Sequence, residues 1–114
     1  MLRISKSWDN KSKGFQMFFS NGWTVSVQFG EGNYCETRID ETGHVASDTA
    51  EIAAWNHKNE WFKFPSDNVK GWCKPEEVAR FVHAISTAPK DGQPSFSSEG
   101  FDDIDEAFDR IIQD

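Results

Sequence analysis

The chain has 114 residues and a net charge of −7, and ten Phe and five Trp help bring its aromatic content to 14%. This length suits one domain with a single core, in which large rings must supply most of the buried area. No apolar run of about 18 residues is present to span a bilayer, and residues 1–6 lack the apolar segment of a signal peptide. Because Cys35 and Cys73 are too few for the dense disulfide framework of a small secreted domain, we expect a cytoplasmic protein with free thiols.

The first strong local signal is a β-hairpin over residues 15–29. Asn21-Gly22 stands between two strand-like runs, and this pair is preferred by type I′ turns, in which both central residues need positive φ. The second run alternates with a period of two, which predicts one buried face and one face in water. The buried face would carry Trp23, Val25, Val27 and Phe29, and the wet face Thr24, Ser26 and Gln28.

Further strands are predicted after the turn at residues 30–33. Residues 34–39 alternate again and can pair as a third strand, whereas residues 40–49 are polar and predict an exposed loop. A second hairpin follows, built from residues 50–55 and 60–64 and joined by a loop of hairpin length.

A helix is predicted to begin at Pro75, because Pro suits the first helical position and acidic residues favour the first turn. An apolar stripe at helical spacing runs along it and predicts packing across the apolar side of the sheet. The stripe contains Val78, Phe81, Val82 and Ile85, and the residues off it are Glu76, Glu77, Arg80 and His83.

Residues 87–100 are rich in Pro, Gly and Ser and predict a linker. Beyond it, residues 99–114 hold seven acidic residues against Arg110, so this tail carries −6 and residues 1–98 carry −1. The tail is predicted to form an acidic amphipathic helix that docks on its own body, on a second copy or on a partner protein. Its apolar stripe is Phe101, Ile104, Phe108 and Ile111.

The expected fold is therefore α+β. It comprises an antiparallel sheet of four to five strands with one main helix on one face, and a C-terminal acidic amphipathic helix. The body spans residues 1–86, the linker 87–100 and the acidic helix 101–114.

Motifs for catalysis and cofactor binding do not fit this chain. Residues 30–35 begin like a dinucleotide fingerprint, but Cys35 stands where the third glycine is needed. Residues 40–51 have the length of a calcium loop but the wrong ligand positions. The histidines are not spaced as zinc ligands, and no nucleophile signature is present. We expect no enzyme, no metal and no cofactor; the histidines are His44, His57 and His83.

The excess of aromatic residues suggests a binding surface. Trp55, Trp61 and Trp72 occur near several cations, and rings beside cations hold nucleotide-like ligands by stacking and by contacts to phosphate. The alternative is that these rings mainly fill the core. Loop residues on a rigid scaffold commonly carry function. The predicted ligand-binding residues are Asn33, Tyr34, Arg38, Trp61 and Lys63.

Several segments together resemble a family. These are Ser20 to Gly30 (SNGWTVSVQFG), Gly32 to Cys35 (GNYC), Ala50 to Trp55 (AEIAAW), Gly71, and Pro75 to Val78. The chain resembles small uncharacterised proteins of tailed bacteriophages over residues 15–86, whereas the tail from Ser95 lies outside the resemblance. Lys74 departs from the serine-type helix cap of that group.

The resemblance implies a viral accessory protein that works in the bacterial cytoplasm. Our leading hypothesis is a phage-encoded, non-enzymatic binding protein that counteracts a host defence. It would do so by sequestering a nucleotide-type signal or by blocking a host protein. The alternatives are an acidic inhibitor that mimics DNA and a structural protein of the phage particle.

Overall fold

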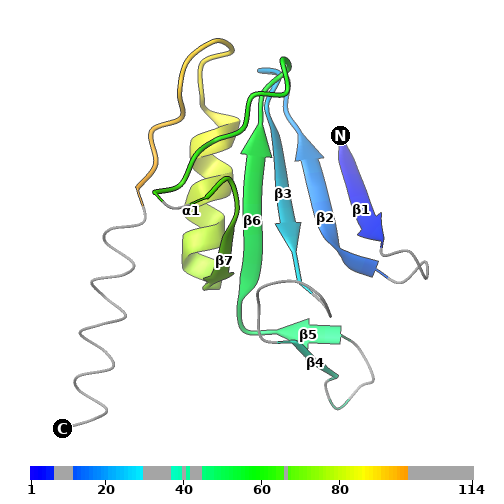
Figure 1. Ribbon diagram of the computed structural model, residues 1–114. Coiled ribbons are helices and arrows are strands. Elements are labelled where there is room, and N and C mark those ends of the chain that lie inside the picture. The colour runs from blue at the N-terminus through cyan, green and yellow to red at the C-terminus, as the bar shows by residue number, and fades with distance from the viewer. Residues whose placement is uncertain (7–11, 30–36, 40, 42–44, 66, 98–114) are drawn as a thin grey trace, which may run out of the picture.

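The computed structural model describes residues 1–6, 12–29, 37–39, 41, 45–65 and 67–97, and it confirms the α+β fold class (Figure 1). Five antiparallel strands form one sheet in the order β1-β2-β3-β6-β7, with helix α1 on one face. Strands β4 and β5 form a separate small sheet. The bounds are β1 Leu2–Lys6, β2 Ser12–Phe18, β3 Thr24–Gln28, β4 Thr37–Ile39, β5 Val45–Ser47, β6 Ala50–Trp55, β7 Lys70–Cys73 and α1 Pro75–Ser86. The predicted C-terminal helix lies outside the described residues.

The β2–β3 hairpin forms as predicted, but its turn differs from the expected type I′. Gly22 has a φ of 88°, whereas Asn21 does not adopt positive φ. The Gly22 N–H donates to the Phe19 carbonyl over 3.1 Å, and the Phe19 N–H donates to the Trp23 carbonyl over 2.9 Å. This is a three-residue loop with a glycine bulge. Asn21 keeps an ordinary backbone, and its side chain is used elsewhere.

The described residues of the predicted third strand belong to the small sheet and not to the main one. Of residues 34–39, the described portion is β4, which pairs with β5. Strand β5 falls within residues 40–49, which we had expected to be a loop. The pairing of two short polar segments depends on their meeting in space, which local alternation does not report.

Strand β6 finds a different main partner from the one predicted. Residues 60–64 touch it through one isolated bridge, between Trp55 and Trp61. The strand that continues the sheet is β7, which pairs Ala50 with Cys73. Strand β7 was not predicted, because a run of four residues is too short to be recognised as a strand. Strand β1, at the opposite edge of the sheet, was not predicted either.

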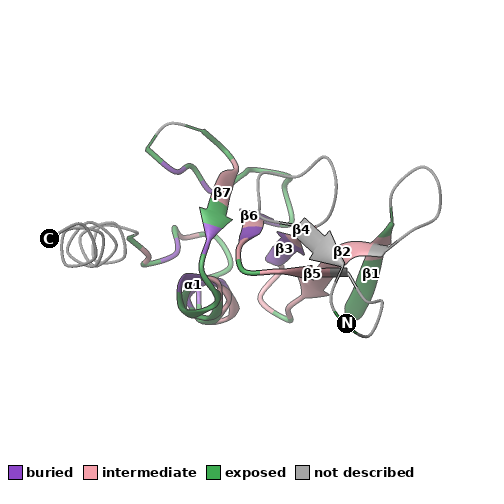
Figure 2. Ribbon diagram, turned by 90° about the horizontal axis from the view of Figure 1, so that it is seen from below, coloured by how far each residue is buried: buried purple, intermediate pink, exposed green. Residues whose placement is uncertain are grey.

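The helix packs through the predicted stripe, with one correction. Phe81 and Ile85 are fully buried, and Val78 and Val82 lie partly buried beside them. Glu77, expected off the stripe, is also buried. It lies one turn before Phe81 on the same face, and its Oε2 accepts a bond from Lys70 Nζ at 2.6 Å. Figure 2 shows the buried side of α1 turned to the sheet.

Residues 87–97, which we had expected to begin a linker, pack against the body. The Phe96 ring lies 5.0 Å from that of Phe81, edge to face. It also contacts the rings of Phe62 and Phe64. These four rings pack together beside the middle of α1, which makes Phe96 part of the domain.

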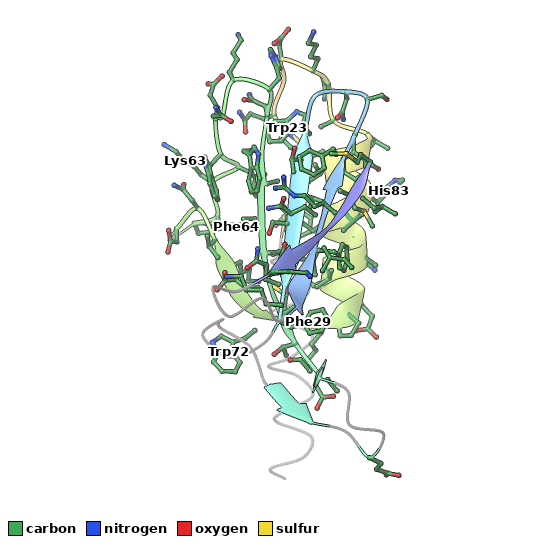
Figure 3. The ribbon with its side chains drawn as sticks, turned by 90° about the vertical axis from the view of Figure 1, so that its right-hand side faces the viewer. Trp23, Phe29, Lys63, Phe64, Trp72 and His83 are labelled. Carbon is green, nitrogen blue, oxygen red and sulfur yellow. The ribbon has the colours of Figure 1, made fainter. Side chains whose placement is uncertain are left out.

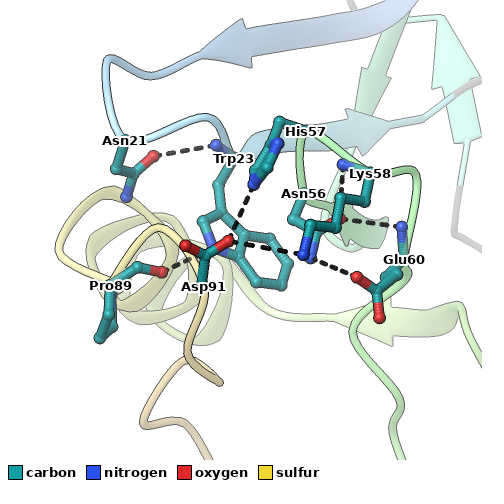
Figure 4. Close-up of polar contacts among 8 residues, drawn as sticks. All are labelled: Asn21, Trp23, Asn56, His57, Lys58, Glu60, Pro89 and Asp91. Carbon is teal, nitrogen blue, oxygen red and sulfur yellow. Dashed lines mark hydrogen bonds and ion pairs between the residues drawn. The ribbon is translucent and has the colours of Figure 1, made fainter.

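Polar contacts fasten the start of the same segment. Asn21 Nδ2 donates to the carbonyls of Ile85 and Ala88, each over 2.9 Å. The indole N–H of Trp23 donates to the Pro89 carbonyl over 3.1 Å (Figure 4). Asn21 therefore satisfies carbonyls that the end of α1 leaves without helical partners.

Asp91 joins the same segment to the loop after β6. Its Oδ1 lies 3.0 Å from His57 Nε2 and 3.9 Å from Lys58 Nζ. The hydrogen bond with His57 is the main cause that holds the pKa of Asp91 below its usual range.

Candidate functional site

The face of the five-stranded sheet opposite α1, called here the outer face, is better packed than predicted. Thr24 and Ser26 were expected in water but are only 6% and 5% exposed. Thr24 pairs with Trp55 on one side and with Phe18 on the other, and both neighbours are larger. Gln28 Nε2 donates to Ser26 Oγ over 3.0 Å. The small side chains of Thr24 and Ser26 are thus packed closely between larger ones, and these two residues are called here the floor of the outer face.

Two indole rings lie together at one end of this floor. The centroids of Trp55 and Trp61 are 4.8 Å apart, with their planes tilted by 38°. Trp55 is half-buried, whereas Trp61 is 41% exposed. A ring supported from one side and open on the other can stack a planar ligand.

Lys63 lies on the same side as Trp61. The Phe62 N–H donates to the Ala54 carbonyl over 2.9 Å, one of the two bonds that make the bridge between Trp55 and Trp61. Phe62 and Phe64 are buried toward α1, so the alternating residues Trp61 and Lys63 face outward. Figure 3 shows Lys63 pointing away from the helix.

The loop over residues 56–60 fixes the start of this segment. Asn56 is buried, and its Oδ1 accepts bonds from the backbone N–H groups of Lys58 and Glu60, each over 2.9 Å (Figure 4). Asn59 takes the left-handed conformation, with a φ of 61°, which asparagine tolerates better than most residues. Trp61 therefore directly follows a turn that is held by its own hydrogen bonds.

Trp72 is the residue of this face that sequence reasoning placed nearby but did not assign to the site. It is 58% exposed and has a φ of 58°. It lies in the irregularity of the β6–β7 pairing, between the pairs at Ala50 and Ile52, and Figure 3 shows it pointing away from α1. A left-handed conformation costs a non-glycine residue about 1–2 kcal/mol. An exposed ring held at such a cost is a candidate for binding.

The structure brings together two of the predicted ligand-binding residues, Trp61 and Lys63. Asn33 and Tyr34 lie outside the described residues, as do the predicted partner-binding residues Phe101, Ile104, Phe108 and Ile111. Arg38 belongs to β4 in the small sheet, and its side chain is outside the described part. Lys70 in β7 pairs with Glu77 on the α1 side.

A recess lies between α1 and residues 95–97. It has a volume of about 510 Å³ and is lined by Ala79, Arg80, His83, Ala84, Thr87, Ser95, Phe96 and Ser97. The Phe96 ring, the one aromatic six-membered ring in this lining, already makes edge contacts with other phenylalanines. The recess is therefore a weaker candidate for stacking a planar ligand than the outer face.

Metal binding and membrane spanning find no support in the described part of the chain. Within it, no three His, Cys, Asp or Glu side chains gather closely enough to hold a metal ion. None of the described helices has the length and apolar character needed to cross a bilayer. Cys73 is a buried free thiol.

Comparisons with protein families, with curated proteins and with solved structures gave no match to this chain. The site must be interpreted from its own chemistry.

Proposed function

We propose that this protein is a non-enzymatic binding protein that holds a nucleotide-type ligand on the outer face of its sheet. The observation that carries the proposal is the exposed Trp61 ring, backed by Trp55 at 4.8 Å and followed by Lys63 on the same side. An indole stacks a base of any sequence, and a lysine ammonium binds phosphate as a point charge.

The surroundings support binding better than catalysis. The floor residues Thr24 and Ser26 are small and closely packed. The groups that face the outer side near Trp61 are an aromatic ring and an ammonium, and these support stacking and charge.

The resemblance to small phage proteins suggests a biological role for such binding. A small viral protein present in quantity would lower the concentration of a free nucleotide signal and so counteract a host defence. This role rests on the ligand proposal and inherits its test.

The test is a binding panel of linear and cyclic nucleotides, measured by quenching of tryptophan fluorescence and by thermal shift. Loss of one stacked base costs about 1–3 kcal/mol, so Trp61→Ala should weaken binding at least about fivefold. Trp61→Phe keeps a ring and should retain most of the affinity. Lys63→Ala should weaken binding, whereas Lys90→Ala, an exposed lysine in the segment after α1, should not. If no member of the panel changes fluorescence or melting temperature, the proposal is wrong.

A second candidate is capture of a host protein by the acidic tail, which the concentration of −6 in residues 99–114 favours. The truncation that tests it should begin at residue 98, because Phe96 packs in the core. Partner capture that survives this truncation would exclude the tail as the binding element.

A further inference from the structure

The outer face carries a second exposed indole, and its place follows from the strand register. Residues 60–64 meet β6 at a single antiparallel bridge, which sets Trp61 beside Trp55. Farther along the same edge of β6, Trp72 lies in the β7 bulge beside Glu51. Trp61 and Trp72 therefore form a row along this edge.

The spacing of this row sets the size of the ligand. Trp55 and Glu51 are four residues apart, which is about 13 Å along a strand. Lys63 is two residues beyond Trp61 in the chain. One planar group stacks only on a ring whose centroid lies within about 7 Å. A single base therefore reaches one of the two exposed indoles, and a ligand that uses both needs two planar groups.

The charges along the row place the anionic part of such a ligand. Lys63 is exposed two residues after Trp61, whereas Glu51 lies at the Trp72 end of the row. Arg3 stands on the far side of the outer face, in the edge strand β1, where its guanidinium lies over the Phe18 ring at 5.1 Å. One lysine on this side suits the single charge of a phosphodiester better than a triphosphate.

Trp72 also shows two independent costs that packing does not explain. It exposes more than half of its surface, and it holds a left-handed backbone. Glycine would adopt this conformation without strain. We propose that Trp72 is a second stacking surface and that the ligand is a dinucleotide, an inference that rests on the proposed function. One base would stack on Trp61 and the other on Trp72, with the linking phosphate at Lys63.

The experiment compares AMP, the linear dinucleotide pApA and the longer single strand oligo(dA) on the full chain. We expect pApA to bind about tenfold more tightly than AMP, because a second base stacks on a second ring. Trp72→Ala should bring pApA to the affinity of AMP and leave AMP unchanged. Trp61→Ala should weaken both ligands. If Trp72→Ala folds poorly, Trp72→Gly serves as the variant.

The outcomes separate the two proposals. If AMP and pApA bind equally and Trp72→Ala changes neither, the dinucleotide inference is overturned and the nucleotide site at Trp61 stands. Oligo(dA) binding much more tightly than pApA overturns the inference in favour of a single-strand surface. If none of the three ligands binds, both proposals fail.

Discussion

Replacing Trp72 by glycine and by alanine should give an unusual order of stability. Both variants lose the ring, so their difference isolates the backbone. Within a regular strand, glycine destabilises a protein by about 0.5–1 kcal/mol relative to alanine. At the observed φ of 58°, alanine pays about 1–2 kcal/mol that glycine avoids. Trp72→Gly should therefore be about 0.5–1 kcal/mol more stable than Trp72→Ala.

Urea unfolding followed by the fluorescence of the remaining tryptophans measures this difference. The melting temperatures of the two variants should differ by about 4 °C, with glycine higher. Leu2 provides the matched control, because it is exposed in β1 and has an ordinary backbone. There alanine should be the more stable replacement. A Trp72→Ala variant as stable as Trp72→Gly would mean that Trp72 is not held in a strained conformation.

Three other substitutions test the contacts that hold residues 87–97 against the body. Asn21→Ala removes bonds to the end of α1 and should lower the free energy of unfolding by about 2 kcal/mol, measured by urea unfolding. Phe96→Ala should cost about 2 kcal/mol, less than a fully buried phenylalanine, whereas Ser95→Ala should cost almost nothing in the same assay. Because the pKa of Asp91 is lowered by His57, its stabilising contribution is present above about pH 4 and is lost as the pH falls through the folded-state value. Melting temperatures of wild type and Asp91→Asn should therefore differ at pH 6 and converge in strong acid.

The assignment of Trp61 and Lys63 to one surface shows what alternation can establish. Two residues apart in an extended segment, they must share a side, and the sequence predicted both as ligand contacts. It grouped Trp72 with nearby aromatic residues but did not assign it to the site, because its position depends on β7 pairing with β6, which no local pattern predicts. The sequence does not predict the left-handed backbone of Trp72 either, since no turn motif is present there.

Residues 87–97 illustrate the opposite error. Their Pro, Gly and Ser content correctly excluded a continued helix, and on composition alone it predicted a linker. Composition does not report docking, and here the Phe96 ring and the bonds from Asn21 and Trp23 hold the segment on the body.

The sequence by itself determined the α+β class, the β2–β3 hairpin and the buried stripe of α1, because periodicity and turn chemistry act within a few residues. Only the tertiary structure decided that β7 completes the sheet, that Glu77 is buried against Lys70, and that two exposed indoles lie on the same face. Each of these features joins segments that are distant in the chain. Their energy comes from contacts that exist only after the chain has closed on itself.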